Sequence, residues 1–529
     1  MKKLIGLTLL SLSFFSLQAQ EKLNEKATTD KFNKLLYYVN NLYVDSVDAE
    51  ELVEIAIVKM LEELDPHTSY IPADEVKKAS EPLKGNFEGI GIRFNILKDT
   101  IFVVQTISGG PSEKIGLMAN DRIVTVDGEL VAGIGIQNSD VVKYLKGPKD
   151  TEVTVGVKRG KSIELLEFTI TRDKIPIYSV DAAYMVAPKV GYVKVNRFSA
   201  TTMDELLAAL DELKKAGMND LILDLQGNGG GYLSTAIAMV DEFLSDDKLI
   251  VYTQGRAFPK DERHAKNKGV FEKGRLMVLI DESSASASEI VSGAIQDWDR
   301  GMIVGRRSFG KGLVQRPVAL PDGSELRLTM QKYYTPAGRC IQKSYEEGFD
   351  AYRNEKYDRY ENGEVFSKDS IQVAESEKFY TSKGRVVYGG GGITPDVFVP
   401  LDTTGTSAYF SNLVRSGTVN NFALQYADKN KAKLLNSYPE LTDFVKNYTV
   451  TDELLNELIS IATEAEIEFN QEEFDISKDA ITIRLKALLA RSLYDGEGFY
   501  IVINDLNESL QEALRLLDSN EYKRMNLTR

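Results

Sequence analysis

The sequence predicts a multidomain α+β protein with a helical segment at each end, a small β-rich domain, and a core in which strands alternate with helices. A chain of 529 residues is longer than one compact core usually is. Apolar residues recur at helical spacing near both ends, whereas short alternating runs fill residues 84–172 and longer strand-helix repeats fill residues 190–340. These changes of pattern indicate separate domains.

The first twenty residues have the composition of a cleaved secretory signal. Two lysines precede an apolar stretch from Leu4 to Leu17, and small and polar residues surround Ala19. No cysteine follows this stretch, so we expect no lipid anchor, and no later run reaches the roughly 18 apolar residues of a membrane span. We therefore expect residues 1–20 to be a signal peptide and the mature protein, from about Glu21, to be soluble and exported, either periplasmic or secreted.

Composition excludes several classes of function. The formal charge of −15, without a concentrated basic face, argues against a nucleic-acid-binding protein. Cys340 is the only cysteine, so no internal disulfide can form. The only histidines are His67 and His264, far apart in the sequence, and a structural zinc site needs about four N or S ligands. We expect no metal and no other cofactor.

Residues 21–83 form the predicted N-terminal helical region. The apolar side chains between residues 30 and 65 fall on one stripe per helix: Leu35, Leu36, Val39 and Leu42, then Leu52, Ile55, Ala56, Met60 and Leu61. The segment LDPHTSYIP ends this pattern because its Asp and Pro stop a helix. We interpret His67 within it as a hydrogen-bonded turn residue rather than a catalyst.

A small β-rich domain is predicted for residues 84–172, from runs such as IFVVQTI and EVTVGVKR. Its opening, GNFEGIGIRF, places Gly89 and Gly91 just before a strand. The glycines could form a tight turn into the strand, or successive backbone N–H groups there could face a carboxylate. The motif alone does not choose between the two.

The predicted core covers residues 173–400, with a polar, Tyr-rich insertion at about 342–385. Strand-helix alternation implies a largely parallel sheet, which carries its sites at the carboxyl ends of the strands. Two such ends stand out, LDLQGNGGG and IDESSASASE. Residues 401–529 form the predicted C-terminal helical region, and their apolar stripes could pack on one another or form a dimer.

Ser286 can be interpreted in two ways. With Glu289 it fits the S-x-x-E capping box, which would make it the start of a helix. The four serines of DESSASASEI are more than a cap requires, however, and a strand-to-helix turn presents a side chain at the mouth of the sheet, where N–H groups can face a developing negative charge. Ser286 is therefore also a candidate nucleophile.

A serine nucleophile needs a base, and the scarcity of histidine directs attention to Lys311 in RRSFGKGLVQ. In an extended segment Lys311 and Gln315 point the same way, so the amide could orient the amine. A lysine base requires its pKa to fall from about 10.4 toward about 7 or 8, which burial can cause. Taken alone, Lys311 could instead be a solvated loop residue.

The reaction also needs donors for an oxyanion. The backbone N–H groups of Gly230 and Gly231, with that of Ala287, could hold it.

The order of the motifs resembles that of the carboxyl-terminal processing (tail-specific) peptidases, which are PDZ-containing serine endopeptidases with a Ser-Lys catalytic pair. The motifs are, in chain order, FEGIGI, LDLQGNGGGYL, SSASASEIVSGAIQDW, GRRSFGKGLVQ, YYTPAGRCIQ and GGITPDV. The resemblance covers roughly residues 30–400. It implies a PDZ fold for residues 84–172 and an α/β protease core, ClpP/crotonase-like, for residues 173–400.

The resemblance also implies roles for individual residues. Ser286 would be the nucleophile, Lys311 the base and Gln315 the residue that orients the lysine, and the offset of 25 positions between Ser286 and Lys311 is the spacing of the family. Asp297 matches an acidic residue with a supporting role. In the PDZ domain, the backbone N–H groups that would bind a substrate's C-terminal carboxylate by strand addition are those of Ile90, Gly91 and Ile92.

Three positions depart from the family pattern. Gln226 and Gly229 stand where the family commonly has Arg and Pro in its glycine turn, which removes one local ion pair and could loosen the turn. Lys146 stands where relatives often have Arg before a glycine. The insertion and the C-terminal helical region lie outside the resemblance.

These residues predict an exported serine endopeptidase that recognises C-terminal tails through a PDZ domain and hydrolyses peptide bonds with a Ser-Lys dyad. The expected partners are protein or peptide substrates with exposed C-terminal tails. We expect no nucleic acid and no integral membrane span, and a homodimer could form through the helical ends.

Two rival functions are a non-catalytic PDZ scaffold or holdase with a protease-like shell, and a non-peptidic esterase that uses the same dyad. A comparison of ester and tailed-peptide substrates separates them.

Overall fold

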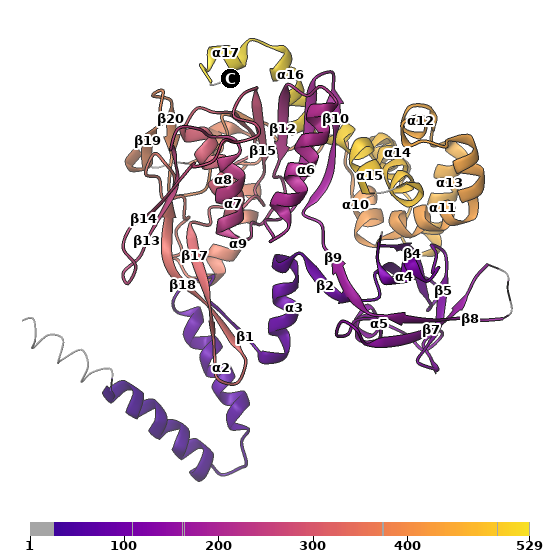
Figure 1. The fold of residues 1–529 in the computed structure, drawn as a ribbon, viewed down its shortest axis with the longest axis horizontal. Helices are drawn as coiled ribbons and strands as arrows, with labels where there is room; N and C mark the ends of the chain where they lie inside the picture. The colour runs from indigo at the N-terminus through magenta and orange to yellow at the C-terminus, as the bar shows by residue number, and fades with distance from the viewer. Residues whose placement is uncertain are drawn as a thin grey trace, which may run out of the picture. The chain divides into compact units, whose positions relative to one another are not determined.

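The computed structural model describes residues 26–107, 109–160, 162, 164–372, 375–494 and 496–527 (Figure 1). The chain divides into two units. The first runs up to Ala73 and also includes Arg316–Leu328, and the second comprises Asp74–Gln315 together with the chain from Thr329 onward. The predicted signal peptide, residues 1–20, lies outside the described residues.

The first unit consists of helices followed by a short strand. Its elements are a helix at residues 26–42, α2 (Ala49–Glu62) and β1 (Ser69–Ile71). Asp48 caps α2 with its carboxylate, and β1 pairs antiparallel with residues 325–327. Asp65 closes the turn between α2 and β1 by accepting the backbone N–H groups of His67 and Thr68. His67 is therefore a turn residue, as the sequence indicates.

The β-rich domain of the second unit is an antiparallel sheet with two helices, preceded by α3 (Ala73–Lys84). Its elements are β2 (Asn86–Gly89), β3 (Ile92–Ile96), β4 (Ile101–Thr106), α4 (Pro111–Lys114), β5 (Arg122–Val126), β6 (Glu129–Leu130), α5 (Asn138–Leu145), β7 (Glu152–Lys158), β8 (Leu166–Thr171) and β9 (Asp173–Pro176). The sheet order is β3-β4-β5-β7-β8, with β6 beside β5, while β2 pairs with β9. Among the described strands β3 is thus an edge, the kind of position at which a further strand can pair.

A six-stranded sheet forms the α/β core. Its elements are β10 (Val180–Ala187), β11 (Val190–Val195), α6 (Thr202–Lys215), β12 (Asp220–Asp224), α7 (Leu233–Asp241), β15 (Leu276–Ile280), α8 (Ala287–Asp297), β16 (Met302–Gly305) and β21 (Val397–Phe398). The order is β10-β11-β12-β15-β16-β21; β10 is antiparallel to β11 and each later pair is parallel. Buried parallel strands have continuous apolar runs, as in LMVLI of β15.

Helices cover both faces of this sheet. Leu221 and Leu223 of β12 pack in one cluster with α6, α7 and α8, whereas Ile222 between them packs in a second cluster, because successive side chains of a strand point to opposite faces. That second cluster contains Leu510 and Ala513 of α16 (Glu508–Asp518) and extends to α17 (Glu521–Arg524). Part of the predicted C-terminal helical region is therefore a layer of the core.

A smaller set of strands and the insertion complete the second half of the core. The strands are β13 (Leu249–Gln254), β14 (Asp261–His264), β17 (Leu313–Ala319) and β18 (Glu325–Tyr334). β13 pairs with β14 and with the end of β18, where the rings of Tyr252 and Tyr334 stack 4.7 Å apart. The predicted insertion forms α9 (Phe349–Glu361), η1 (Lys368–Ser370), η2 (Glu375–Glu377) and β19 (Lys378–Tyr380), and β19 pairs with β20 (Val386–Tyr388), which directly follows the insertion.

Residues 408–506 form a helical subregion with its own core. Its elements are α10 (Ala408–Arg415), α11 (Thr418–Ser437), α12 (Leu441–Asn447), α13 (Asp452–Glu464), α14 (Gln471–Leu493), α15 (Gly496–Ile503) and η3 (Asn504–Leu506). The apolar side chains of α13 and α14 share one buried cluster with α11, which contacts both helices; its members include Leu454, Leu458, Ile481, Leu485 and Leu488.

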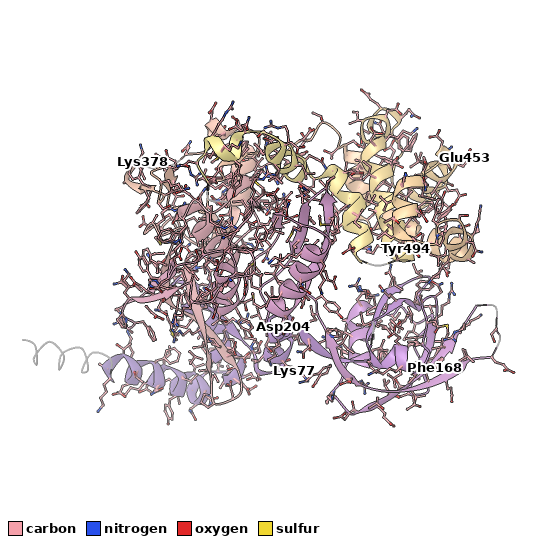
Figure 2. All side chains as sticks on the ribbon, turned by 45° about the horizontal axis from the view of Figure 1, so that its top comes forward. Lys77, Phe168, Asp204, Lys378, Glu453 and Tyr494 are labelled. Carbon is pink, nitrogen blue, oxygen red and sulfur yellow. The ribbon has the colours of Figure 1, made fainter. Side chains whose placement is uncertain are left out.

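The predicted α+β multidomain fold is confirmed. Figure 2 shows the side chains on these elements, with Phe168 of β8 and Tyr494 after α14 among those labelled. Within the described ranges, no helix combines the length and the apolar character that a membrane span needs.

Candidate active site

Ser286 lies in the turn between β15 and α8, at the carboxyl end of a central strand. Its backbone has φ +57° and ψ −111°, in a region that serine rarely adopts. Such backbone strain costs about 1–3 kcal/mol and clusters at functional sites. Asp281 holds the start of the turn, since its carboxylate accepts the N–H groups of Ser283 and Ser284 at 2.9 and 3.0 Å.

The carboxylate of Glu289 joins the Ser286 turn to the segment that carries Lys311. It accepts the backbone N–H of Ser286 at 2.7 Å and that of Lys311 at 2.9 Å. The N–H of Gly310 and the hydroxyl of Ser308 donate to it at 2.7 and 2.5 Å. Burial raises the pKa of Glu289 to about 7, although these hydrogen bonds favour the charged form. One buried carboxylate thus fixes two predicted catalytic segments relative to each other.

Tyr333 on β18 makes a second connection between the same segments. Its hydroxyl group lies 3.1 Å from the carbonyl O of Ser286 and 2.6 Å from that of Lys311, and it can donate to either. Burial raises the pKa of Tyr333 well above its ordinary value, so the hydroxyl remains a donor at neutral pH. Ser286 and Lys311 therefore come from loops that two buried side chains hold together.

The glycine turn after β12 lies directly against the Ser286 turn. A Cβ atom at Gly230 would come within 2.8 Å of the Ser286 Cβ and 3.1 Å of the Ala287 N, so this approach requires glycine. The carbonyl O of Asn228 accepts the N–H of Ala285 at 3.0 Å. The N–H of Gly230 donates to the Asn228 side chain at 2.9 Å, so its use as an oxyanion donor requires that bond to open.

Contacts at both ends hold the glycine turn. At its start, Lys194 of β11 pairs with Asp224 at 3.0 Å and donates to the carbonyl O of Gln226 at 2.6 Å. A buried lysine therefore supplies a cation close to the position where Gln226 replaces the Arg of the family pattern. At its end, Gly231 lies so close to Phe198 that a Cβ atom would come within 2.1 Å of the Phe198 carbonyl O.

Gln315 and Asp297 are the two remaining predicted side chains of the core. The Gln315 amide donates to the hydroxyl group of Thr329 at 3.1 Å. Asp297, at the C-terminal end of α8, is buried and pairs with the buried Arg339 at 2.5 Å. Asp297 also accepts the N–H of Ala337 at 2.9 Å, so it anchors the segment that follows β18.

In the β-rich domain, the predicted carboxylate-binding loop contains Ile90, Gly91 and Ile92, at the start of the edge strand β3. Gly91 has φ +75°, and a Cβ atom there would lie 2.9 Å from the side chain of Ile175. The loop therefore needs glycine. The carbonyl O of Ile90 accepts both the N–H and the hydroxyl group of Ser112, at 3.1 and 2.6 Å.

The insertion helix α9 contacts both loops that carry the candidate residues Ser286 and Lys311, which the sequence did not reveal. Arg359, 3 % exposed, donates to the carbonyl O of Ser308 at 2.8 Å, three residues before Lys311. Lys356 of the same helix donates to the hydroxyl group of Ser283 at 2.7 Å. The predicted insertion is therefore part of the framework around the site.

Models of known families match three parts of the chain. Peptidase family S41 matches residues 189–349, a PDZ domain matches residues 102–159, and a family of unknown function, DUF8443, matches residues 409–495. The first match includes Ser286, Lys311 and the glycine turn. The fold and these matches define a serine peptidase with a PDZ domain, which confirms the predicted class of enzyme.

Two curated relatives assign the family. The chain is 37 % identical over 317 residues to the carboxy-terminal-processing protease of Bartonella bacilliformis, with 59 % of this chain and 72 % of the relative covered. It is 34 % identical over 363 residues to the carboxy-terminal processing protease CtpB of Bacillus subtilis, with 68 % and 73 % covered. The chain therefore belongs to the carboxy-terminal processing protease family, as its motifs predict.

Solved structures include similar chains. The photosystem II D1 C-terminal processing protease is 27 % identical, with 70 % of this chain and 93 % of that chain covered and a TM-score of 0.36. The PDZ domain of the carboxy-terminal protease from Vibrio cholerae, solved with a peptide, is 33 % identical, with 17 % and 97 % covered and a TM-score of 0.16. With such TM-scores, the family assignment rests on the sequence relatives.

Proposed function

We propose that this peptidase is an exported endopeptidase that binds C-terminal tails of proteins and cleaves upstream of them with a Ser-Lys dyad. The observation that carries the proposal is the joint anchoring of the Ser286 and Lys311 segments by Glu289 and Tyr333. Two buried groups that both contact two distant loops give those loops a fixed relative position, which a nucleophile and its base require.

Ser286 is the proposed nucleophile and Lys311 the proposed base. The neutral amine of Lys311 takes the hydroxyl proton while Ser286 Oγ attacks the peptide carbonyl carbon. The ammonium then gives this proton to the leaving amine as the peptide C–N bond breaks, which leaves an acyl-enzyme. Lys311 then takes a proton from water as the water oxygen attacks the ester carbonyl carbon, and it gives this proton to Ser286 Oγ as the acyl C–O bond breaks, which releases the carboxylic acid product. This reaction needs no cofactor.

The oxyanion is proposed to lie between the glycine turn and the start of α8. The proposed donors are the backbone N–H groups of Gly230, Gly231 and Ala287. The close approach of Gly230 to Ser286 and to the Ala287 N supports this position, and the N-terminal end of a helix favours negative charge.

Two side chains are proposed to support the dyad. Gln315, four positions after Lys311, would orient the amine through its side-chain Oε1, while its Nε2 donates to Thr329 at 3.1 Å. Asp297 would act indirectly, because its buried pair with Arg339 fixes the segment that follows β18.

Tail recognition is assigned to the PDZ domain, for which we retain the predicted range 84–172. A tail would add a strand beside β3 and place its carboxylate at the N–H groups of Ile90, Gly91 and Ile92. A peptide with a free C-terminal carboxylate should bind at least about tenfold more tightly than its amidated form, because charge-assisted hydrogen bonds are lost on amidation. Equal affinities in isothermal titration calorimetry would remove this role.

Cleavage of an unfolded protein with an apolar C-terminal tail tests the proposed chemistry. The mature chain, Ser286→Ala and Lys311→Ala would be compared by intact mass of the products, after circular dichroism has shown that both variants are folded. We expect fragments from the wild type alone. Full activity in either variant would exclude the dyad, and tail binding without cleavage by the wild type would favour the scaffold or holdase function.

Export is proposed from the first twenty residues, with their lysines, apolar stretch and small residues. The intact mass of the protein recovered from a periplasmic or secreted fraction should correspond to a chain that begins near Glu21. Recovery of the full-length chain from the cytoplasm alone would contradict this localisation.

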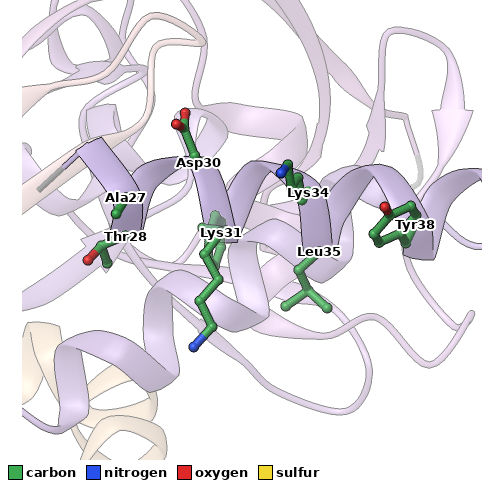
Figure 3. A pocket seen from close by; sticks show the side chains of 8 residues that line it. Ala27, Thr28, Asp30, Lys31, Lys34, Leu35 and Tyr38 are labelled. Carbon is green, nitrogen blue, oxygen red and sulfur yellow. The ribbon is translucent and has the colours of Figure 1, made fainter. Parts of the chain in front are cut away.

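A homodimer through the N-terminal helices is proposed from their exposed apolar side chains. On the helix at residues 26–42, Leu35 and Leu42 are 59 and 71 % exposed, and Figure 3 shows the side chains of Leu35 and Tyr38, which line a shallow pocket along this helix. Met60 of α2 is 60 % exposed. Apolar stripes of this kind mark contact surfaces. Sedimentation should show a dimer, and Leu35→Glu with Leu42→Glu should produce a monomer; a monomeric wild type would refute the proposal.

A further inference from the structure

The glycine turn beside Ser286 is also connected to the C-terminal region. The side-chain Oε1 of Gln226 accepts a hydrogen bond from Asn507 Nδ2 at 3.0 Å, and Gln226 Nε2 lies 3.4 Å from Ser509 Oγ. Asn507 is 281 positions further along the chain, immediately before α16. The side chain that replaces the family's Arg therefore reaches out of the turn to a distant helix.

The turn after Gln226 has little stiffness of its own. Four of the five residues from 227 to 231 are glycines, so contacts rather than local preference must fix its shape. The backbone of Gln226 is held on both sides, because its N–H donates to Asp224 at 2.8 Å and its carbonyl O accepts from Lys194 at 2.6 Å. A shift of Gln226 would displace the start of the segment that carries the proposed oxyanion donors.

Asn507 is anchored on a rigid element. Its Oδ1 accepts the N–H of Leu510 at 3.2 Å, which makes Asn507 the N-cap of α16. That helix buries Leu510 and Ala513 completely against the core sheet. The two ends of one short side chain thus connect a fixed helix with the glycine turn.

We propose that Asn507 is a positioning residue for peptide hydrolysis, which holds the glycine turn through Gln226 where its N–H groups meet the oxyanion. The inference rests on the proposed function of that turn. It gives the C-terminal region a part in catalysis besides its packing. Misplaced donors weaken stabilisation of the transition state more than binding of the substrate, so kcat should fall while KM stays constant.

Asn507→Ser separates the two roles of this side chain. Serine also caps helices but is too short to reach Gln226. For a tailed peptide we expect kcat to fall about 5- to 20-fold, with KM unchanged within about twofold. Gln226→Met should cause the same loss, and the double variant should lose no more than either single variant, because both remove one hydrogen bond.

Two further variants act as controls. Asn470→Ser replaces another asparagine N-cap, which accepts the N–H of Glu473 at 3.1 Å at the start of α14, and it should keep the wild-type kcat. Asn507→Asp keeps both the cap and the reach, and it can accept a hydrogen bond from the Gln226 amide once that amide turns over. It should therefore recover most of the kcat that Asn507→Ser loses.

The outcomes separate this inference from the proposed function. If the wild type cleaves and Ser286→Ala does not, the serine mechanism holds. The Asn507 variants then test the further inference independently of the proposed function. A kcat within twofold of the wild type in both Asn507→Ser and Gln226→Met would then overturn it, and so would strict additivity in the double variant. A loss shared by Asn470→Ser would show a general effect of cap replacement. If Ser286→Ala cleaves as well as the wild type, the proposed function fails and the inference falls with it.

Discussion

Glu289 accepts the backbone N–H of Ser286 at 2.7 Å while its own side chain is completely buried. The same carboxylate accepts the N–H of Lys311 at 2.9 Å. Because burial raises the pKa of Glu289 to about 7, the carboxyl group that joins the Ser286 and Lys311 loops changes its charge near neutral pH. Protonation of Glu289 removes an acceptor from the hydrogen bonds that join these loops.

Glu289→Gln should alter the pH dependence of folding. The pKa of about 7 in the folded protein is above the ordinary 4.5, so the folded state keeps a proton that the unfolded chain loses between those values. The stability that this group contributes is fully present below about pH 4.5 and falls, by up to roughly 3 kcal/mol, as the pH rises through about 7. Denaturant unfolding would be measured at about pH 5 and about pH 8 for both proteins. Between these pH values, the free energy of unfolding should fall more for the wild type than for Glu289→Gln. Parallel pH profiles would contradict the raised pKa.

Ser286→Gly should be more stable than Ser286→Ala, although both should be inactive. The φ of +57° is strained for any residue with a Cβ atom and is accessible to glycine. We expect a difference of about 1 kcal/mol in the free energy of unfolding, from denaturant titrations of the two variants. If Ser286→Ala is equally stable, the backbone of the turn relaxes and stores no strain.

Gly230→Ala should abolish hydrolysis, whereas Gly229→Ala should be tolerated. A Cβ atom at Gly230 meets the Ser286 Cβ at 2.8 Å and the Ala285 carbonyl O at 2.9 Å, and its φ of +103° disfavours any other residue. A Cβ atom at Gly229 has nothing within 4 Å. The kcat for a tailed peptide should fall at least about 100-fold in the first variant, since small displacements at a reacting centre have large effects. Activity retained by Gly230→Ala would show that the two turns move apart freely.

Much of the fold follows from periodicity, because an amphipathic stripe indicates both an element and its buried face. The strand-helix alternation predicted the core, and the apolar stripes in residues 401–529 predicted a helical C-terminal region, which contains α13, α14 and α16. Periodicity does not identify the partner of a stripe, however. The stripes of α13 and α14 join one cluster around α11, whereas that of α16 covers the core sheet, and this choice depends on contacts between residues far apart in the chain.

The candidate site was predicted where its signal is local. Ser286 and Lys311 stand in short motifs at strand ends, and the S-x-x-E spacing predicted the bond between Ser286 and Glu289. The bond from Glu289 to Lys311 spans 22 positions and depends on the folded core. The contact of Asn507 with Gln226 spans 281 positions, so no pattern within a segment could reveal it.

Arg359→Met should destabilise the protein and slow hydrolysis, because Arg359 connects the insertion to the Lys311 segment. Its guanidinium is buried, pairs with Glu355 at 2.6 Å and donates to the carbonyl O of Ser308 at 2.8 Å. Burial lowers the pKa of Arg359, yet the nearby carboxylates favour its charged form. Methionine would preserve much of the packing but leave those carboxylates with one cation fewer.

We expect the free energy of unfolding of Arg359→Met to fall by about 1–3 kcal/mol, because the carbonyl O of Ser308 loses its charged donor while Glu355 keeps its pair with Lys343 at 2.9 Å. The kcat should fall too, because the loop before Lys311 loses an anchor. Arg353→Met on the same helix is the matched control, since Arg353 is exposed and its replacement should change stability by less than about 0.5 kcal/mol. If the two variants unfold alike and both remain fully active, α9 is peripheral to the site, and the loop is held by Glu289 and Tyr333 without help from the insertion.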